Sequence, residues 1–192
     1  MSIKEWALHP FISNFIDNNV FLVIYGPPAT GKTHLAFEIS KYLIYKRRDF
    51  VFLATEAQTF TYGKYFAYNV PLNLVVTREQ LLKEIIESIK LKKYIIIDSI
   101  NYLFRSYDND TSEKELSLIS SLLSSFGGFA TGQITQEGFD SSKMSMDTWI
   151  IPWAKAIGIT NKLNEKVVEL KLLKPRKLIL GYEIIRDGVK WI

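Results

Sequence analysis

The chain of 192 residues contains no cysteine. This absence excludes a disulfide framework, a thiolate nucleophile and a cysteine-ligated zinc site. Two histidines leave little for a histidine-based metal site. The longest strongly apolar runs are about six residues, far below the roughly 18 that a membrane-spanning helix needs. The N-terminal residues also lack the pattern of a signal peptide, so we expect a cytoplasmic protein.

Charge of neither sign dominates the chain as a whole. It holds 24 lysines and arginines against 20 acidic residues, a net charge of +4. Residues 1–150 hold 15 basic against 16 acidic residues, whereas residues 151–192 hold nine against four. The positive excess therefore lies in the last fifth of the sequence. It fits either a solvated basic hairpin or a surface for an acidic partner.

Hydrophobic residues make up 47% of the chain, as in an ordinary globular protein. Continuous apolar runs predict buried strands at 20–25, 50–55, 72–76, 94–98 and 129–134. Helices are predicted between these strands, ending near 45, 91 and 125. Strand-like segments follow at 156–163, 166–173, 178–185 and 189–192. We expect an α/β fold with a mainly parallel central sheet, extended by C-terminal antiparallel strands.

The sequence Gly26-Pro-Pro-Ala-Thr-Gly31-Lys32-Thr33 matches the phosphate-binding pattern G-x-x-x-x-G-K-[ST]. It lies between a predicted strand and a predicted helix, where backbone N–H groups can surround phosphates. The predicted ATP-binding residues are Gly26, Pro27, Pro28, Ala29, Thr30, Gly31, Lys32 and Thr33. In this pattern the lysine reaches the β- and γ-phosphates, and the threonine hydroxyl is a ligand of Mg²⁺.

Two acidic residues end neighbouring predicted strands. Asp98 follows the apolar run 94–97, and a carboxylate there faces the nucleotide and can hold Mg²⁺ directly or through water. Glu56 directly follows the strand at 50–55, which is a suitable position to activate the attacking water. The cofactors expected are therefore ATP and Mg²⁺.

These residues together resemble the RecA/RadA recombinase superfamily, and in particular core-only archaeal RadA paralogues of the RadB type. Thr55-Glu56 looks like the family's catalytic Thr-Glu, and residues 96–105 are similar to its Asp-Ser strand and the segment after it. Thr131-Gly-Gln133-Ile resembles the strand end whose glutamine senses the γ-phosphate. The resemblance implies a RecA-like P-loop NTPase core with Glu56, Lys32 and Gln133 as catalytic residues.

The resemblance also carries expectations about organisation and partners. We expect one ATPase domain over 1–192, with a lead-in at 1–19 and hairpin strands at 149–192. The N-terminal DNA-binding domain of full recombinases is expected to be absent, and the sequence contains no Phe-x-x-Ala polymerisation tether. The segments similar to the DNA loops are acidic, although Phe139 and Lys143 could contact DNA. The predicted function is a weak ATPase that assists a RadA-type recombinase in recombination and DNA repair, with weak binding to single-stranded DNA.

Other interpretations of the same motifs remain. The phosphate-binding pattern alone suits an AAA+ ATPase, which requires an acidic pair where this chain has Asp98-Ser99 and a helical lid where hairpins are predicted. A nucleotide kinase requires an arginine-rich lid. A self-sufficient ring of the KaiC or DnaB type is the alternative function, because Lys174 and Arg176 match residues that reach a neighbouring subunit's γ-phosphate in such rings. A basic hairpin tip explains these two residues equally well.

Overall fold

The computed structural model describes residues 8–66, 70–105, 110–134, 147–185 and 188–192. Within them, nine strands form one sheet in the order β3-β2-β4-β5-β1-β6-β7-β8-β9. The strands are β1 (Phe21–Gly26), β2 (Phe50–Ala54), β3 (Leu72–Leu74), β4 (Tyr94–Asp98), β5 (Gly128–Gln133), β6 (Ala156–Lys162), β7 (Val167–Lys174), β8 (Leu178–Ile185) and β9 (Gly188–Trp191). The helices are α1 (Pro10–Asp17), α2 (Lys32–Tyr45), α3 (Ala57–Phe66), α4 (Arg78–Lys90), the 3-10 turn η1 (Tyr102–Phe104), α5 (Asp110–Phe126) and α6 (Asp147–Ile150).

The sheet has a parallel half and an antiparallel half, which confirms the predicted fold class. In the order of the sheet, neighbouring strands from β3 through β2, β4, β5 and β1 to β6 pair in parallel. Neighbouring strands from β6 to β9 pair antiparallel. The division follows from the connections, because helices join β1, β2, β4 and β5 whereas short turns join the last strands. The carboxyl ends of the parallel strands therefore meet at one edge of the sheet, where ligands bind in folds of this kind.

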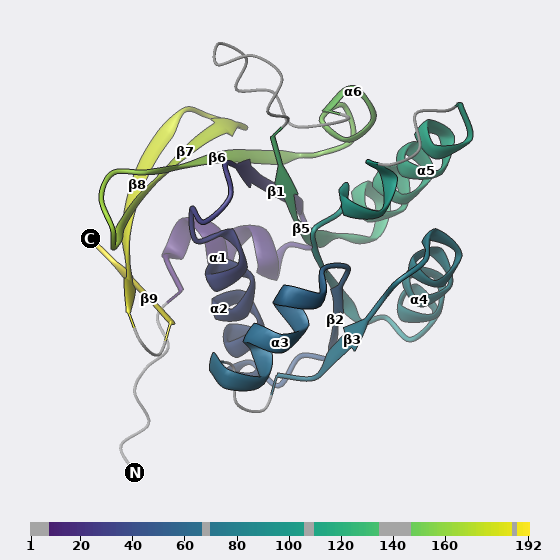
Figure 1. Ribbon diagram of the computed structural model, residues 1–192, viewed down its shortest axis with the longest axis horizontal. Helices are drawn as coiled ribbons and strands as arrows, with labels where there is room; N and C mark the ends of the chain where they lie inside the picture. Colours follow the sequence, from purple (N-terminus) through teal and green to yellow (C-terminus); the bar gives the residue numbers. More distant parts are fainter. Residues whose placement is uncertain (1–7, 67–69, 106–109, 135–146, 186–187) are drawn as a thin grey trace.

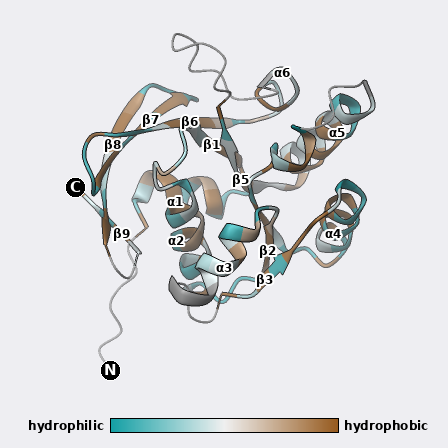
Figure 2. Cartoon of the chain, viewed as in Figure 1, coloured by the Kyte–Doolittle hydropathy of each residue, from teal (hydrophilic) through white to brown (hydrophobic). Residues whose placement is uncertain are grey.

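Helices cover both faces of the sheet (Figure 1). On one face α1 and α2 pack over the strands in one apolar cluster, and on the other α4 and α5 pack in a second cluster. Hydrophobic colour concentrates on the central strands, and polar colour on the outer sides of the helices (Figure 2). Residues of β1 and β4 are buried along the whole of both strands, as expected for strands covered twice. No helix among the described residues is long and apolar enough to cross a membrane.

The segment expected as a simple lead-in contains a helix, α1. Its N-cap is His9, whose Nδ1 accepts a hydrogen bond from the Phe11 N–H at 3.1 Å, and Pro10 fills the first helical position. Ile12 and Ile16, four residues apart, are fully buried against the sheet. This i, i+4 pair was the available sequence signal. The helix was missed because a histidine cap is uncommon.

Candidate active site

The phosphate-binding loop joins the end of β1 to the start of α2. Gly31 has a φ of 76°, and a Cβ there would lie 2.9 Å from the Ile184 Cδ1 atom. A Cβ on Gly26 would lie 2.5 Å from the Thr160 carbonyl oxygen. Both glycines are therefore required by the close approach of β6 and β8, as well as by the path of the loop.

Side chains from the antiparallel half of the sheet hold this loop in place. The Thr30 hydroxyl lies 2.7 Å from the Thr160 hydroxyl and donates to the Pro27 carbonyl oxygen at 2.8 Å. The Tyr182 hydroxyl donates to the Thr30 carbonyl oxygen at 3.2 Å. Burial raises the Tyr182 pKa, so this phenol stays a hydrogen-bond donor at any ordinary pH. The loop is thus fixed by β6 and β8, which the motif itself does not reveal.

The Lys32 side chain is buried within the loop, with 7% of its surface exposed. Its Nζ donates to the carbonyl oxygens of Gly26 at 3.0 Å and Pro27 at 2.6 Å. Burial lowers the pKa of Lys32 to about 8, although Asp98 and Glu56 nearby favour the charged form. The ammonium group is therefore costly to keep in this site, and a polyanionic ligand would stabilise it.

Asp98 ends β4 and accepts hydrogen bonds from three threonines. Its Oδ2 accepts from the Thr33 hydroxyl at 2.9 Å and from the Thr59 hydroxyl at 2.7 Å. Its Oδ1 accepts from the Thr131 hydroxyl. Thr33 and Asp98 thus come together as predicted, whereas Thr59 on α3 and Thr131 on β5 were missed. Thr131 had a signal, since it lies two residues before Gln133 and so points to the same face of its strand.

Thr33 and Asp98 have the donor atoms that Mg²⁺ prefers. A hydroxyl and a carboxylate oxygen in contact supply a small part of an octahedral shell, and Mg²⁺ takes the rest from water and substrate phosphates. No cluster of three or more histidine, aspartate or glutamate side chains occurs among the described residues. The donor set therefore fits a magnesium ion bound together with a nucleotide.

Glu56 and Gln133, predicted as catalytic, are in direct contact. The Gln133 Nε2 atom donates to Glu56 Oε1 at 2.8 Å, and an Arg105 guanidinium nitrogen donates to Gln133 Oε1 at 2.7 Å. Burial raises the pKa of Glu56, and the Asp98 carboxylate raises it further, while Ser99, Arg105 and Lys32 lower it. Arg105 was not predicted as a site residue. Its position just after η1 gives no local signal, because the contact depends on where β5 ends.

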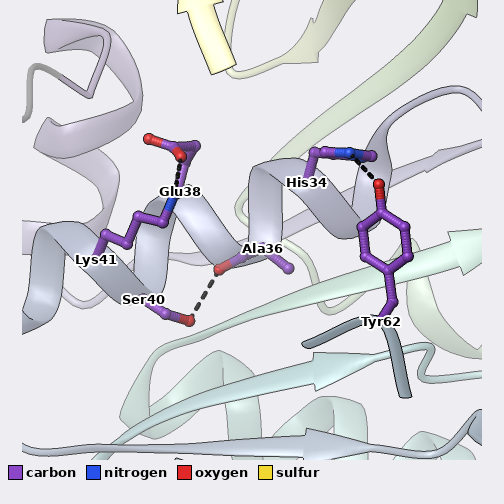
Figure 3. Close-up of polar contacts among 6 residues, drawn as sticks. All are labelled: His34, Ala36, Glu38, Ser40, Lys41 and Tyr62. Atoms are coloured by element: carbon purple, nitrogen blue, oxygen red, sulfur yellow. Dashed lines mark hydrogen bonds and ion pairs between the residues drawn. The ribbon is translucent and has the colours of Figure 1, made fainter. Parts of the chain in front are cut away.

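Lys32, Thr33, Glu56, Asp98 and Gln133 line one pocket of about 570 Å³, whereas Arg105 contacts Gln133 without lining it. The other side of the pocket includes His34 on α2 and Tyr62 on α3, whose Nε2 and hydroxyl oxygen are hydrogen-bonded at 2.8 Å (Figure 3). Figure 3 also shows that the Glu38–Lys41 ion pair of 2.9 Å lies farther along α2 than His34. The remaining lining residues include Gln58, Lys162, Glu165 and Ile184.

Lys174 and Arg176, predicted to act across a subunit boundary, lie at the opposite edge of the sheet from this pocket. Lys174 pairs with Ile157 near the start of β6, and its Nζ donates to the Ala154 carbonyl oxygen at 2.7 Å. The Arg176 guanidinium lies 4.8 Å from the ring centre of Phe11. Phe139 and Lys143, predicted to contact DNA, lie outside the described residues.

Comparison with known families gives a match over most of the chain. Residues 22–169 match the family described as "ATPase family associated with various cellular activities (AAA)". The matched range begins in β1, contains the phosphate-binding loop, Glu56, Asp98 and Gln133, and ends in β7. No curated protein matches the chain. The match supports the broad class of P-loop ATPases; it is to the AAA family and does not confirm the resemblance to RecA/RadA recombinases.

Proposed function

This chain belongs to the AAA family of ATPases, and we propose that it binds ATP with Mg²⁺ in the pocket at the carboxyl ends of the parallel strands and hydrolyses it slowly. One observation carries this proposal. The groups needed for phosphate binding, metal binding and water activation line the same pocket although they come from distant parts of the chain. The phosphate-binding loop by itself does not bring the metal-binding and water-activating groups into the same pocket; the fold does.

Each residue has a role in the proposed reaction. The loop N–H groups and the start of α2 would hold the phosphates, and Lys32 would neutralise them. Thr33 and Asp98 would hold Mg²⁺, which on binding shields the phosphate charge. Glu56 would orient the attacking water and accept its proton, while Gln133 fixes the carboxylate that does so. Gln133 would also report the γ-phosphate to Glu56 through their contact.

We expect slow turnover because the cations that line the pocket are lysines. Among the described residues that line it, lysines are present and arginine is not, and the nearby Arg105 guanidinium is hydrogen-bonded to Gln133 Oε1 instead of facing the phosphate position. An arginine that stabilises the transition-state charge adds roughly 10³- to 10⁵-fold to phosphoryl transfer. Without one, a steady-state rate far below one per second is the natural expectation for the isolated chain.

We further propose that the chain is a RadA-type paralogue that assists a RadA-type recombinase on single-stranded DNA during recombination and repair. Three features support this. Glu56 follows β2 instead of pairing with Asp98, Gln133 ends β5, and strands β6 to β9 follow where an AAA+ ATPase would carry a helical lid. The test is ATP hydrolysis with and without single-stranded DNA and a RadA-type recombinase. Hydrolysis that responds to neither would contradict the proposed partners.

The alternative of a self-sufficient ring of the KaiC or DnaB type depends on Lys174 and Arg176 reaching another subunit. Both side chains contact their own chain, at Ala154 and Phe11. These contacts would have to be exchanged on assembly, so we rank this alternative second. Native mass with and without ATP discriminates, because a stable hexamer would favour the ring.

Nucleotide affinity is expected to fall as pH rises through about 8. In the folded chain without nucleotide, burial lowers the pKa of Lys32 to about 8. The positive charge that attracts phosphate is therefore lost above that pH. Calorimetric titration with ATP from pH 6.5 to 9.5 should show the dissociation constant rising by up to about tenfold per unit above pH 8. Lys32→Arg, which stays charged, should lack this alkaline loss. An equal loss in both proteins would assign it to another group.

Replacing Arg105 by glutamine is expected to move the acidic limb of the turnover–pH profile to higher pH. The limb reports ionisation of Glu56, whose pKa is raised chiefly by burial and lowered by Arg105. Loss of the positive charge should raise the limb by up to about one pH unit. Arg105→Lys should keep the wild-type limb. An unchanged limb in the glutamine variant would show that Arg105 does not act on Glu56.

A further inference from the structure

The edge of the sheet opposite the nucleotide pocket carries four helix-to-strand turns of similar geometry. They lead from α1 to β1, α2 to β2, α4 to β4 and α5 to β5. In each turn one residue has a positive φ: Asn19 (53°), Arg47 (55°), Lys92 (54°) and Gly127 (88°). Glycine and asparagine are the usual residues at this helix-ending position, because other side chains strain it by roughly 1–2 kcal/mol.

The turns at Arg47 and Lys92 have the same hydrogen bonds as the turn at Asn19. Arg47 N–H donates to the Ile44 carbonyl at 3.0 Å, and Lys92 N–H donates to the Ile89 carbonyl at 3.0 Å. Asn19 N–H donates to the Ile16 carbonyl at 3.2 Å. The backbone therefore requires a residue with positive φ at the same position of all three turns. A basic residue takes this position only in the two turns that precede β2 and β4.

These two turns are neighbours, because β2 and β4 pair with Phe50 opposite Tyr94. The Tyr94 N–H also donates to the Asp49 carbonyl oxygen at 2.9 Å. Residues 46–49 and 90–93 together form what we name the basic turn surface. Its six basic residues are Lys46, Arg47, Arg48, Lys90, Lys92 and Lys93. Asp49 is the single carboxylate within these two ranges.

The charges of the basic turn surface are not neutralised by ion pairs within the part of the chain that the structure describes; the ion pairs found there involve Lys41, Arg78 and Lys171. Arg48 is held in place, since its guanidinium lies 4.7 Å from the centre of the Tyr94 ring and donates to the Ile16 carbonyl at 2.6 Å. Tyr45, immediately before the surface, is 49% exposed. Exposed cations beside a solvent-facing aromatic ring are the groups that contact phosphates and stack on bases.

We propose that the basic turn surface binds the phosphate backbone of single-stranded nucleic acid. The choice of this partner rests on the proposed function, whereas the surface itself does not. An anionic bilayer fits less well, because surface-bound helices insert a continuous apolar face, and the core-facing sides of α2 and α4 are buried against the sheet. The exposed apolar side chains at or next to the basic turn surface, Ile44 (44%) and Leu91 (63%), are single residues on two separate turns. The C-terminal basic strands also fit less well, since Lys171 is paired with Glu169 at 3.0 Å.

The test is fluorescence anisotropy of labelled oligothymidylate titrated with the full chain at several salt concentrations. The variant is Arg47→Asn with Lys92→Asn, because asparagine suits the positive φ and keeps the turns intact. We expect affinity to fall about tenfold or more near physiological salt. The slope of log affinity against log salt should become shallower by about 1.4, which corresponds to two lost phosphate contacts on a single strand. The melting temperature should stay the same or rise.

The matched control is Lys171→Gln with Lys177→Gln, which removes two positive charges from the C-terminal strands and should leave affinity near that of the wild type. Equal loss in both variants would overturn the proposal in favour of net charge. Absence of binding by the wild-type chain, or stronger binding to phosphatidylserine vesicles than to the oligonucleotide, would also overturn it. Lys32→Ala separates this surface from the proposed ATPase, because that variant should lose ATP and still bind the oligonucleotide.

Discussion

ATP binding is expected to fall by at least about 100-fold when Lys32 is replaced by alanine. The Lys32 ammonium is the cation placed inside the phosphate-binding loop, where it bonds the Gly26 and Pro27 carbonyl oxygens without nucleotide. Hydrogen bonds to charged groups contribute about 1.5–3 kcal/mol each. Two such bonds to phosphate oxygens would account for a 100-fold loss, since 1.4 kcal/mol corresponds to a factor of ten. Calorimetric titration of the variant with ATP and Mg²⁺ measures this directly.

Unfolding should not explain that loss. Burial lowers the pKa of Lys32 in the folded chain, so the unfolded chain binds a proton at this side chain more readily than the folded one. The folded state therefore gains stability as pH rises from about 8 towards 10.5, and at neutral pH the charge opposes folding. Lys32→Ala should melt at or above the wild-type temperature without nucleotide. Lys83→Ala, at an exposed position on α4, is the control for both measurements, and wild-type affinity in Lys32→Ala would refute the assigned site.

The local motifs were predictable because their chemistry depends on neighbours in the sequence. The phosphate-binding loop needs fixed spacing between Gly26, Gly31 and Lys32, and such spacing is visible in the chain itself. Asp98 and Glu56 could be placed because Asp98 ends one apolar strand and Glu56 comes two residues after another, and parallel strands present their carboxyl ends together. The order of the strands and the positions of α2, α4 and α5 followed from the same alternation, whereas α1, α3 and α6 were not predicted.

Contacts made by tertiary pairing could not be predicted in this way. Thr59 reaches Asp98 only because α3 follows β2, and Arg105 reaches Gln133 only because η1 lies beside the end of β5. Charge shows the same limit. Summing over residues 1–150 gave a nearly neutral segment, although pairing of β2 with β4 brings six basic residues together within it. A sum of charges along the sequence does not reveal a charged surface that forms when turns distant in the sequence become neighbours in the fold.

Glu56→Gln is expected to keep ATP binding and to lose turnover by about 10²- to 10⁴-fold, the usual contribution of a general base. The glutamine amide oxygen can still accept the hydrogen bond that Gln133 donates to Glu56, so the pocket should keep its shape. The amide cannot accept the proton of the attacking water. Single-turnover hydrolysis of bound ATP then isolates the chemical step from product release.

Replacing each carboxylate by its amide, as Glu56→Gln or Asp98→Asn, also tests which of the two accepts the proton of the attacking water. Asp98 lies in the same pocket, but its two oxygens accept hydrogen bonds from Thr33, Thr59 and Thr131, which leaves it suited to holding a metal ion. Glu56 is half-buried with a raised pKa, a condition that favours proton transfer near neutral pH. If Glu56→Gln turns over ATP at the wild-type rate, the base must be Asp98 or another group. If Asp98→Asn loses the magnesium dependence of nucleotide affinity while Glu56→Gln retains it, the two carboxylates have the separate roles that their surroundings indicate.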